Sequence, residues 1–239
     1  MSTVSSTLSK ANNESQSTAT TPTKTPVRNW VAFSSSSGQT FQTVWTSLAP
    51  ETQSRFAGLF IDRQCGALDL AKEFLPADKI FDFSSSKTKE DFEKAFLEWN
   101  ASQEEKPIVF LIGYFRLISR GFLDQGLALV NTHPSLLPAF PGLDKKVHEA
   151  AYNQALISGF SVHMVNENMD DGPLIFQRSV DTSDCKSADE LRDKVRVLEQ
   201  KYLPRVIDQL ILTEISHQDR NLVTRELQNK KGFPLKCVD

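Results

Sequence analysis

Short apolar runs alternate along the chain with longer segments in which apolar residues recur at helical spacing. The run at 107–112 is nearly continuously apolar, which is typical of a strand that is covered on both faces of a sheet. Gly, Pro, Ser and Asp bound the short runs, as they commonly bound strands. Strands are therefore predicted at residues 30–33, 56–61, 79–83, 107–112, 160–165 and 174–180, with a further strand starting at Leu127.

Segments with apolar positions at i, i+3, i+4 and i+7 predict helices. The clearest helix is predicted at 88–99, where Phe92, Phe96 and Trp99 follow this spacing. The motif Ser187-Ala188-Asp189-Glu190 fits a capping box, which opens a long helix to about residue 212. Further helices are predicted at 39–48, at 66–74, as one turn at 121–125, and from 148 to about 157.

This alternation of strands and helices defines the expected fold class. It predicts an α/β protein with a Rossmann-like, mostly parallel sheet and helices on both faces. Ligands bind at the carboxyl ends of the strands in such sheets. Polar residues that directly follow a predicted strand are therefore the candidates for function.

Both ends of the chain lie outside this pattern. Residues 1–28 are rich in Ser and Thr and nearly lack large apolar side chains, so they cannot bury enough surface to offset their ordering entropy. A disordered tail is the simpler interpretation, and a transit peptide is the alternative. Residues 29–212 are then one domain, and the polar segment 213–239 is a C-terminal appendage.

Charge and cysteine content narrow the choice of partners. The chain has 239 residues and a net charge of −3, with a pI of about 5.9. It has no basic stripe for nucleic acid or an anionic membrane, and no apolar run near the roughly 18 residues of a membrane helix. The 3 cysteines are isolated, with neither metal-ligand spacing nor a disulfide framework. A cytoplasmic protein without a metal is therefore expected.

The stretch 127–143 carries the strongest candidate chemistry. It begins apolar, turns polar at Asn131 and His133, and continues into a proline-stiffened loop. An amide and an imidazolium at the end of a buried strand can both donate to an oxygen that becomes negative during a reaction. Asp170, in the acidic turn 166–173, would hold the ring protonated if that turn lies close. Separate structural roles for the three residues are the alternative.

Two further features carry weaker signals. His163 is in the middle of a predicted strand, where a packed, hydrogen-bonded histidine is the simpler interpretation. Strand 30–33 leads through a serine-rich loop and Gly38 into a helix, which is a geometry that presents backbone N–H groups to an anion. With a single glycine, this loop pattern alone favours a plain strand-to-helix turn. The chain has no nucleophile elbow, Walker loop or zinc motif.

Three motifs, taken in order, are similar to those of a known family. The sequence NTHPSLLPAFPGL at 131–143 closely resembles the signature of the phosphoribosylglycinamide formyltransferase family. The turn GYFRLIS at 113–119 is similar to the family's folate-binding turn. Residues 161–165 and 169–175 resemble its strand and acidic loop. Order and spacing agree from about residue 29 to residue 212.

The resemblance implies a Rossmann-like formyltransferase fold and a defined reaction. The family transfers the formyl group of 10-formyltetrahydrofolate to the amine of glycinamide ribonucleotide in purine biosynthesis. By position, Asn131 and His133 would stabilise the oxyanion formed when the amine attacks directly. Asp170 would keep His133 charged and help to move the proton through water. Small-molecule substrates are the expected partners, and the chain is expected to be a monomer or a homodimer.

The resemblance also assigns binding residues. Those implied for the folate pocket are Phe115, Arg116, Leu117, Ile118, Asn131, Asn166 and Asp170. Those implied for the glycinamide substrate are Gly38, Gln39 and Thr40 at the phosphate loop, Lys89 near the phosphate, and Glu199 at the amine end.

The sequence departs from the family where the acceptor would bind. Ser36 stands where the phosphate loop usually has glycine, and Thr40 where it usually has asparagine; a serine is bulkier and stiffer. His148 is the residue available to replace a histidine-rich turn that is missing here. A different amine or water as acceptor therefore remains an alternative, as does a folate-binding protein without turnover. Pro134 argues against water, because hydrolase relatives usually have a second histidine there.

Overall fold

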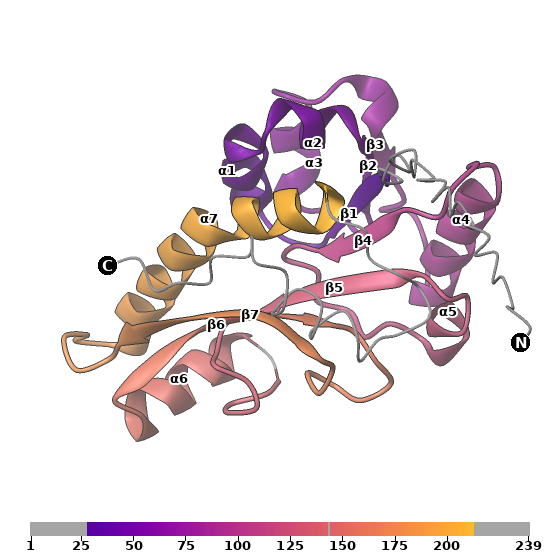
Figure 1. The fold of residues 1–239 in the computed structure, drawn as a ribbon. Coiled ribbons are helices and arrows are strands. Elements are labelled where there is room, and N and C mark those ends of the chain that lie inside the picture. The colour runs from indigo at the N-terminus through magenta and orange to yellow at the C-terminus, as the bar shows by residue number, and fades with distance from the viewer. Residues whose placement is uncertain (1–27, 143, 213–239) are drawn as a thin grey trace, which may run out of the picture.

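The computed structural model describes residues 28–142 and 144–212. The predicted tail, except for Arg28, and the predicted appendage therefore lie outside the described residues. Seven strands form one sheet in the order β3-β2-β1-β4-β5-β6-β7 (Figure 1). Their bounds are Trp30–Ser34 (β1), Phe56–Ile61 (β2), Ile80–Asp82 (β3), Ile108–Leu111 (β4), Ala128–His133 (β5), Ile157–Met164 (β6) and Leu174–Asp181 (β7).

The sheet is parallel over most of its width. Strands β1 to β5 pair in parallel, whereas β6 runs antiparallel to both β5 and β7. The predicted mostly parallel α/β sheet is confirmed. Because parallel strands end at the same edge, the segments that follow β1, β2, β4 and β5 meet there.

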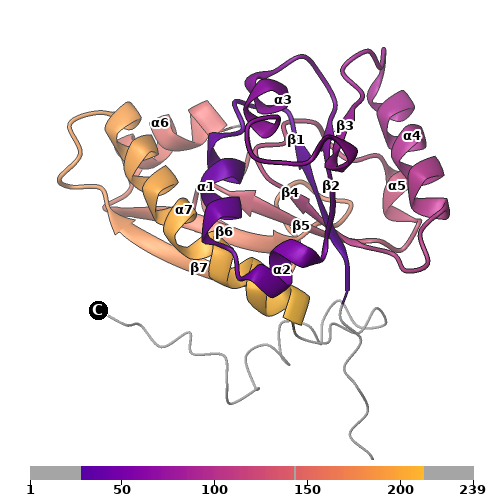
Figure 2. The same cartoon turned by 90° about the horizontal axis from the view of Figure 1, so that it is seen from above.

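Helices cover both faces of the sheet, as predicted. Side chains of α1, α3, α6 and α7 form one hydrophobic cluster, and those of α4 and α5 belong to the other. Figures 1 and 2 show α7 lying alongside α1. The helix bounds are Gln39–Ser47 (α1), Pro50–Ser54 (α2), Gly66–Ala71 (α3), Lys89–Ala101 (α4), Arg120–Leu123 (α5), Asp144–Gln154 (α6) and Ala188–Leu212 (α7), with a 3-10 helix, η1, at Ala77–Lys79.

Strand β1 lies in the middle of the parallel strands and supplies both faces. Trp30 and Ala32 belong to one cluster, and Val31 and Phe33 belong to the other. This alternation follows from the two-residue period of a strand. Phe33 is fully buried among aromatic rings whose centroids lie 4.8–6.1 Å away, namely those of Phe60, Phe92, Phe96, Tyr114 and Phe122.

Helix α7 begins with the predicted capping motif. Ser187 Oγ accepts a hydrogen bond from Glu190 N at 3.2 Å. The Glu190 carboxylate accepts from Lys186 N at 2.8 Å, one residue earlier than in the standard box. In the ranges that the structure describes, no helix combines the length and apolarity needed to cross a membrane.

The sequence prediction missed one helix and misplaced the bounds of several elements. Helix α2 was not predicted, because its 5 residues are too few to show a helical period. The helix expected from residue 148 to about residue 157 instead spans Asp144–Gln154, and β6 begins at Ile157 rather than at Phe160. Ser158 and Gly159 interrupt the apolar run, but their backbones pair with Val180 and Ser179 of β7.

Candidate active site

Strand β5 carries the two predicted donors to the carboxyl edge of the sheet. Its residues are buried as far as Val130. Asn131 is then half-buried, and His133 is 4% exposed. The two residues are two positions apart on a strand, so their side chains lie on the same face.

Strand β6 places a second histidine beside Asn131. The β5–β6 pairing sets His163 directly opposite Asn131, and Asn131 Nδ2 lies 3.2 Å from His163 Nε2. His163 Nδ1 lies 3.0 Å from Met164 O, which can only accept, so Nδ1 carries the proton of the neutral ring. His163 Nε2 then accepts from the Asn131 amide. Burial lowers the pKa of His163, while the hydrogen bond to Met164 O and the charge of Asp170 oppose this shift.

Asp170 reaches both histidines from the loop between β6 and β7. Its φ is 53°, in the left-handed region, which Asp tolerates better than most residues do. Oδ2 lies 3.4 Å from His133 Nδ1 and accepts from Gly142 N at 2.9 Å. Oδ1 lies 3.7 Å from His163 Nε2, beyond hydrogen-bonding distance. The structure thus brings Asn131, His133 and Asp170 into one cluster.

Both ring nitrogens of His133 face oxygen acceptors. Nδ1 faces Asp170, and Nε2 lies 2.9 Å from Phe140 O. A histidine can donate to both acceptors at once only with a proton on each nitrogen. Phe140 has a φ of 53°, which is uncommon for a bulky residue, so the second contact depends on a strained backbone.

The proline loop beside His133 is fixed from β6 and β7. Ser161 is the β6 partner of His133. Its Oγ donates to Ser135 O at 2.6 Å and accepts from Leu137 N at 2.9 Å. Gln177 Nε2 donates to Leu137 O at 2.8 Å. The loop is therefore a rigid wall next to the cluster, as its prolines suggest.

The turn 113–119 forms another part of the same edge. Phe115 and Leu117 are 51% and 58% exposed, whereas Arg116 and Ile118 are half-buried. Arg120, which follows the turn, forms an ion pair of 3.0 Å with Glu167 of the acidic loop. The turn and the acidic loop therefore border each other.

In the acidic loop itself, Asn166 is half-buried and accepts from Asn168 N at 3.0 Å. In the described part of the chain, no group of three or more His, Cys, Asp or Glu residues is arranged to hold a metal ion.

The serine-rich loop packs against the turn 113–119. Gly38 is the N-cap of α1 with a φ of 80°, and no side chain caps the helix. Gln39 is exposed and Thr40 is half-buried. A Cβ added at Gly113 would lie 2.3 Å from Ser36 Oγ. Ser36, which departs from the family pattern, therefore turns its hydroxyl toward Gly113.

The two remaining predicted residues lie on helices. Lys89 is the first residue of α4, and its Nζ donates to Leu117 O at 3.3 Å. It also lies 3.9 Å from Glu90. Glu199 is half-buried on α7. In this structure, Lys89 thus contacts the backbone of the turn 113–119.

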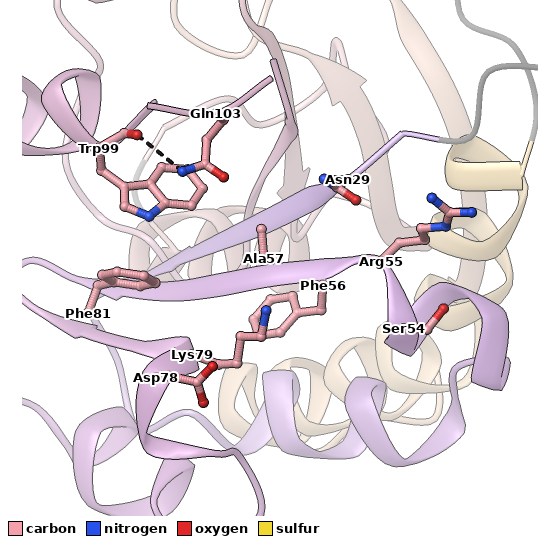
Figure 3. A pocket seen from close by; sticks show the side chains of 10 residues that line it. All are labelled: Asn29, Ser54, Arg55, Phe56, Ala57, Asp78, Lys79, Phe81, Trp99 and Gln103. Carbon is pink, nitrogen blue, oxygen red and sulfur yellow. Dashed lines mark hydrogen bonds between the residues drawn. The ribbon is translucent and has the colours of Figure 1, made fainter. Parts of the chain in front are cut away.

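A separate pocket lies at the opposite edge of the sheet. It has a volume of about 290 Å³, and Arg55, Lys79, Phe81 and Trp99 are among the residues that line it (Figure 3). These residues lie near the amino ends of β2 and β3 and the carboxyl end of α4. None of the predicted site residues lines this pocket, so it is distinct from the cluster around His133.

Comparison with known proteins identifies the class. The family described as formyl transferase matches residues 28–207, and the chain belongs to this family. The phosphoribosylglycinamide formyltransferase of Bacillus subtilis is 33% identical over 188 residues, which cover 77% of this chain and 95% of that protein.

Solved structures agree. Glycinamide ribonucleotide transformylase 1 from Geobacillus kaustophilus is 32% identical with a TM-score of 0.66, over 78% of this chain and 100% of the other. The phosphoribosylglycinamide formyltransferase of Brucella melitensis is 30% identical with a TM-score of 0.66, over 79% and 98%. The family resemblance inferred from the three motifs is confirmed.

The sequence prediction missed the place of His163 in the cluster. Interpreted as a packed strand histidine, it is indeed 2% exposed and bonded to backbone, but it also contacts Asn131. The available signal was the polar pair Ser161 and His163, two positions apart in the otherwise apolar run 160–165. That spacing matches Asn131 and His133 on the neighbouring strand.

Proposed function

We propose that the protein transfers a formyl group from 10-formyltetrahydrofolate to the amine of glycinamide ribonucleotide, in the de novo synthesis of purines that leads to IMP. Membership of the formyl transferase family and the names of the relatives support the reaction class. The single observation that carries the mechanism is the contact of His133 with Asp170, next to Asn131 at the carboxyl edge of the sheet.

In the proposed mechanism, the amine of the acceptor attacks the formyl carbon directly. The new carbon–nitrogen bond forms, the bond from that carbon to N10 of the folate breaks, and the proton lost by the amine reaches N10 through water and Asp170. Asn131 and protonated His133 stabilise the negative charge on the formyl oxygen. Asp170 keeps His133 protonated.

The contacts of the cluster suggest how each donor becomes available. One N–H of the Asn131 amide is used by His163 Nε2, which leaves the other for the formyl oxygen. His133 must exchange its contact with Phe140 O for the formyl oxygen, because Asp170 occupies its other nitrogen. Phe140 has a strained backbone while its carbonyl makes this contact. Loss of the contact would let that backbone relax, which would lower the free-energy cost of the exchange.

The folate would lie between the turn and the acidic loop. Phe115 and Leu117 offer exposed apolar surface, while the backbone of Arg116 and Ile118 and the loop from Asn166 to Asp170 would hold the pterin. The phosphate of the acceptor would bind at Gly38, Gln39 and Thr40 with help from Lys89, and its amine end near Glu199. We further propose a cytoplasmic enzyme that is a monomer or a homodimer.

The test is formation of tetrahydrofolate from 10-formyltetrahydrofolate by the purified protein. The rate should depend on glycinamide ribonucleotide. His133→Ala should lower kcat by roughly 100-fold or more, as loss of one oxyanion donor commonly does. An unchanged kcat would exclude the proposed role of His133.

One observation keeps a second acceptor in view. Ser36 stands where the family's phosphate loop usually has glycine, and its hydroxyl is directed to Gly113. The alternative function is formyl transfer to an amine without a phosphate. A panel of amine acceptors separates the two, because turnover with only unphosphorylated amines would favour the alternative.

A further inference from the structure

Two buried carboxylates lie behind the turn 113–119 rather than in the cluster. Asp62 follows β2 and is fully buried, and Glu93 on α4 is 4% exposed. Burying a carboxylate is costly unless strong donors surround it. Each of these residues finds such donors in the turn.

Glu93 binds Ser119 twice. Ser119 N donates to Oε1 at 2.8 Å, and Ser119 Oγ donates to Oε2. The same hydroxyl accepts from Phe122 N at 3.2 Å and so caps α5. Both oxygens of the Glu93 carboxylate therefore act as acceptors, one for the Ser119 N–H and the other for the Ser119 hydroxyl.

Asp62 holds the side chain of Arg116. Its Oδ2 lies 2.6 Å from Arg116 Nε and 3.3 Å from Arg63 Nη2. The Arg116 side chain is 24% exposed, so its guanidinium is directed inward, to the buried carboxylate of Asp62. The carboxylates also act on Tyr114, whose pKa is raised first by burial and then by Asp62 and Glu93.

Two further contacts fix the backbone between these anchors. Phe115 N donates to Ser35 Oγ at 3.4 Å, and Leu117 O accepts from Lys89 Nζ at 3.3 Å. Phe115 and Leu117 thereby point their side chains outward, while Arg116 and Ser119 are tied to the interior. The turn has no regular secondary structure of its own, so its shape depends on these contacts.

We infer that Asp62 and Glu93 are positioning residues, which fix the backbone of the turn 115–119 for the folate co-substrate without touching it. The inference rests on the proposed function. It predicts that loss of either carboxylate weakens folate binding. Binding of the acceptor, and kcat at saturating folate, should change little, because the Asn131–His133–Asp170 cluster is held by β5, β6 and the 166–173 loop.

The test compares Glu93→Gln and Asp62→Asn with wild type and with Glu98→Gln. Glu98 lies on the same helix with its side chain 69% exposed, which makes it the matched control. Calorimetry with 5-deazatetrahydrofolate, which has no formyl group to transfer, should give a Kd raised about tenfold or more in the first two variants, as expected for a lost charge-assisted hydrogen bond. The KM for 10-formyltetrahydrofolate should rise in parallel, and the Kd for glycinamide ribonucleotide should stay within about twofold.

The outcomes separate the inference from the function. If wild type binds no folate, the proposed function fails and the inference falls with it. If wild type binds and both variants bind equally well, the inference is overturned while the function stands. Should Glu93→Gln not fold, Ser119→Ala removes one hydroxyl from the same contact and gives the same comparison.

Discussion

Acidification should destabilise the fold through His163. The ring is 2% exposed, and burial lowers its pKa. The unfolded chain therefore takes up a proton near the ordinary histidine pKa of about 6.5, while the folded chain stays neutral to lower pH. The contribution to stability is fully present above about pH 7 and is lost as the pH falls through about 6.5 toward the lowered pKa.

The contacts of His163 set the size of this effect. One proton changes the free energy of unfolding by at most about 1.4 kcal/mol per pH unit. A proton on Nε2 would turn that acceptor into a donor facing the Asn131 amide at 3.2 Å. Protonation of His163 is therefore unfavourable in the folded state. The carboxylate of Asp170, 3.7 Å from Nε2, makes it less unfavourable, and the charge of His133 makes it more so.

Urea unfolding of wild type and of His163→Gln between about pH 5.5 and pH 7.5 measures how much His163 contributes to the free energy of unfolding at each pH. Glutamine is uncharged throughout this range and can still donate to a backbone carbonyl. Between the upper and the lower pH, the free energy of unfolding of wild type should fall by about 1 kcal/mol more than that of the variant. The same pH slope in both proteins would refute a neutral, buried His163.

Three more substitutions test other parts of the structure. Asp170→Asn should lower kcat by about 100-fold or more in steady-state assays, because Asn cannot hold an imidazolium by charge; a kcat within about threefold of wild type would contradict its role. Gly172→Ala would place a Cβ 1.7 Å from Met164 O, a backbone atom. It should lower Tm by several degrees, at a cost of about 1–3 kcal/mol, whereas Gly121→Ala, with nothing within 4 Å, should not. Phe33→Ala should cost about 3–5 kcal/mol in urea unfolding, and a loss below about 1 kcal/mol would mean that the aromatic cluster around it is loosely packed.

Much of the fold was predictable because periodicity reports burial. The runs at β1, β2 and β4 are apolar on both faces, and the structure covers both faces there. The change from apolar to polar at Asn131 correctly marked the last residues of a strand at the carboxyl edge of the sheet. The short helix α2 and the first residues of β6 were not predicted, because neither segment has an apolar period of its own.

The geometry of the site depends on pairings that periodicity does not encode. Asp170 approaches His133 only because β6 folds back antiparallel to β5 with His163 opposite Asn131. Glu93 is a charged residue of α4 that the apolar spacing does not include, yet it is buried where Ser119 donates to it. In both cases the deciding partner is remote in sequence, and no local pattern specifies it.

The boundary between β5 and β6 is where the sheet changes from parallel to antiparallel, and the cluster lies on that boundary. Asn131 and His133 come from one side of it, and His163 and Asp170 come from the other. The connection that joins the sides, α6, contributes none of these four side chains. A chain cut within α6 would leave two pieces with half of the cluster each, so the site is a property of the joined halves and of neither piece alone.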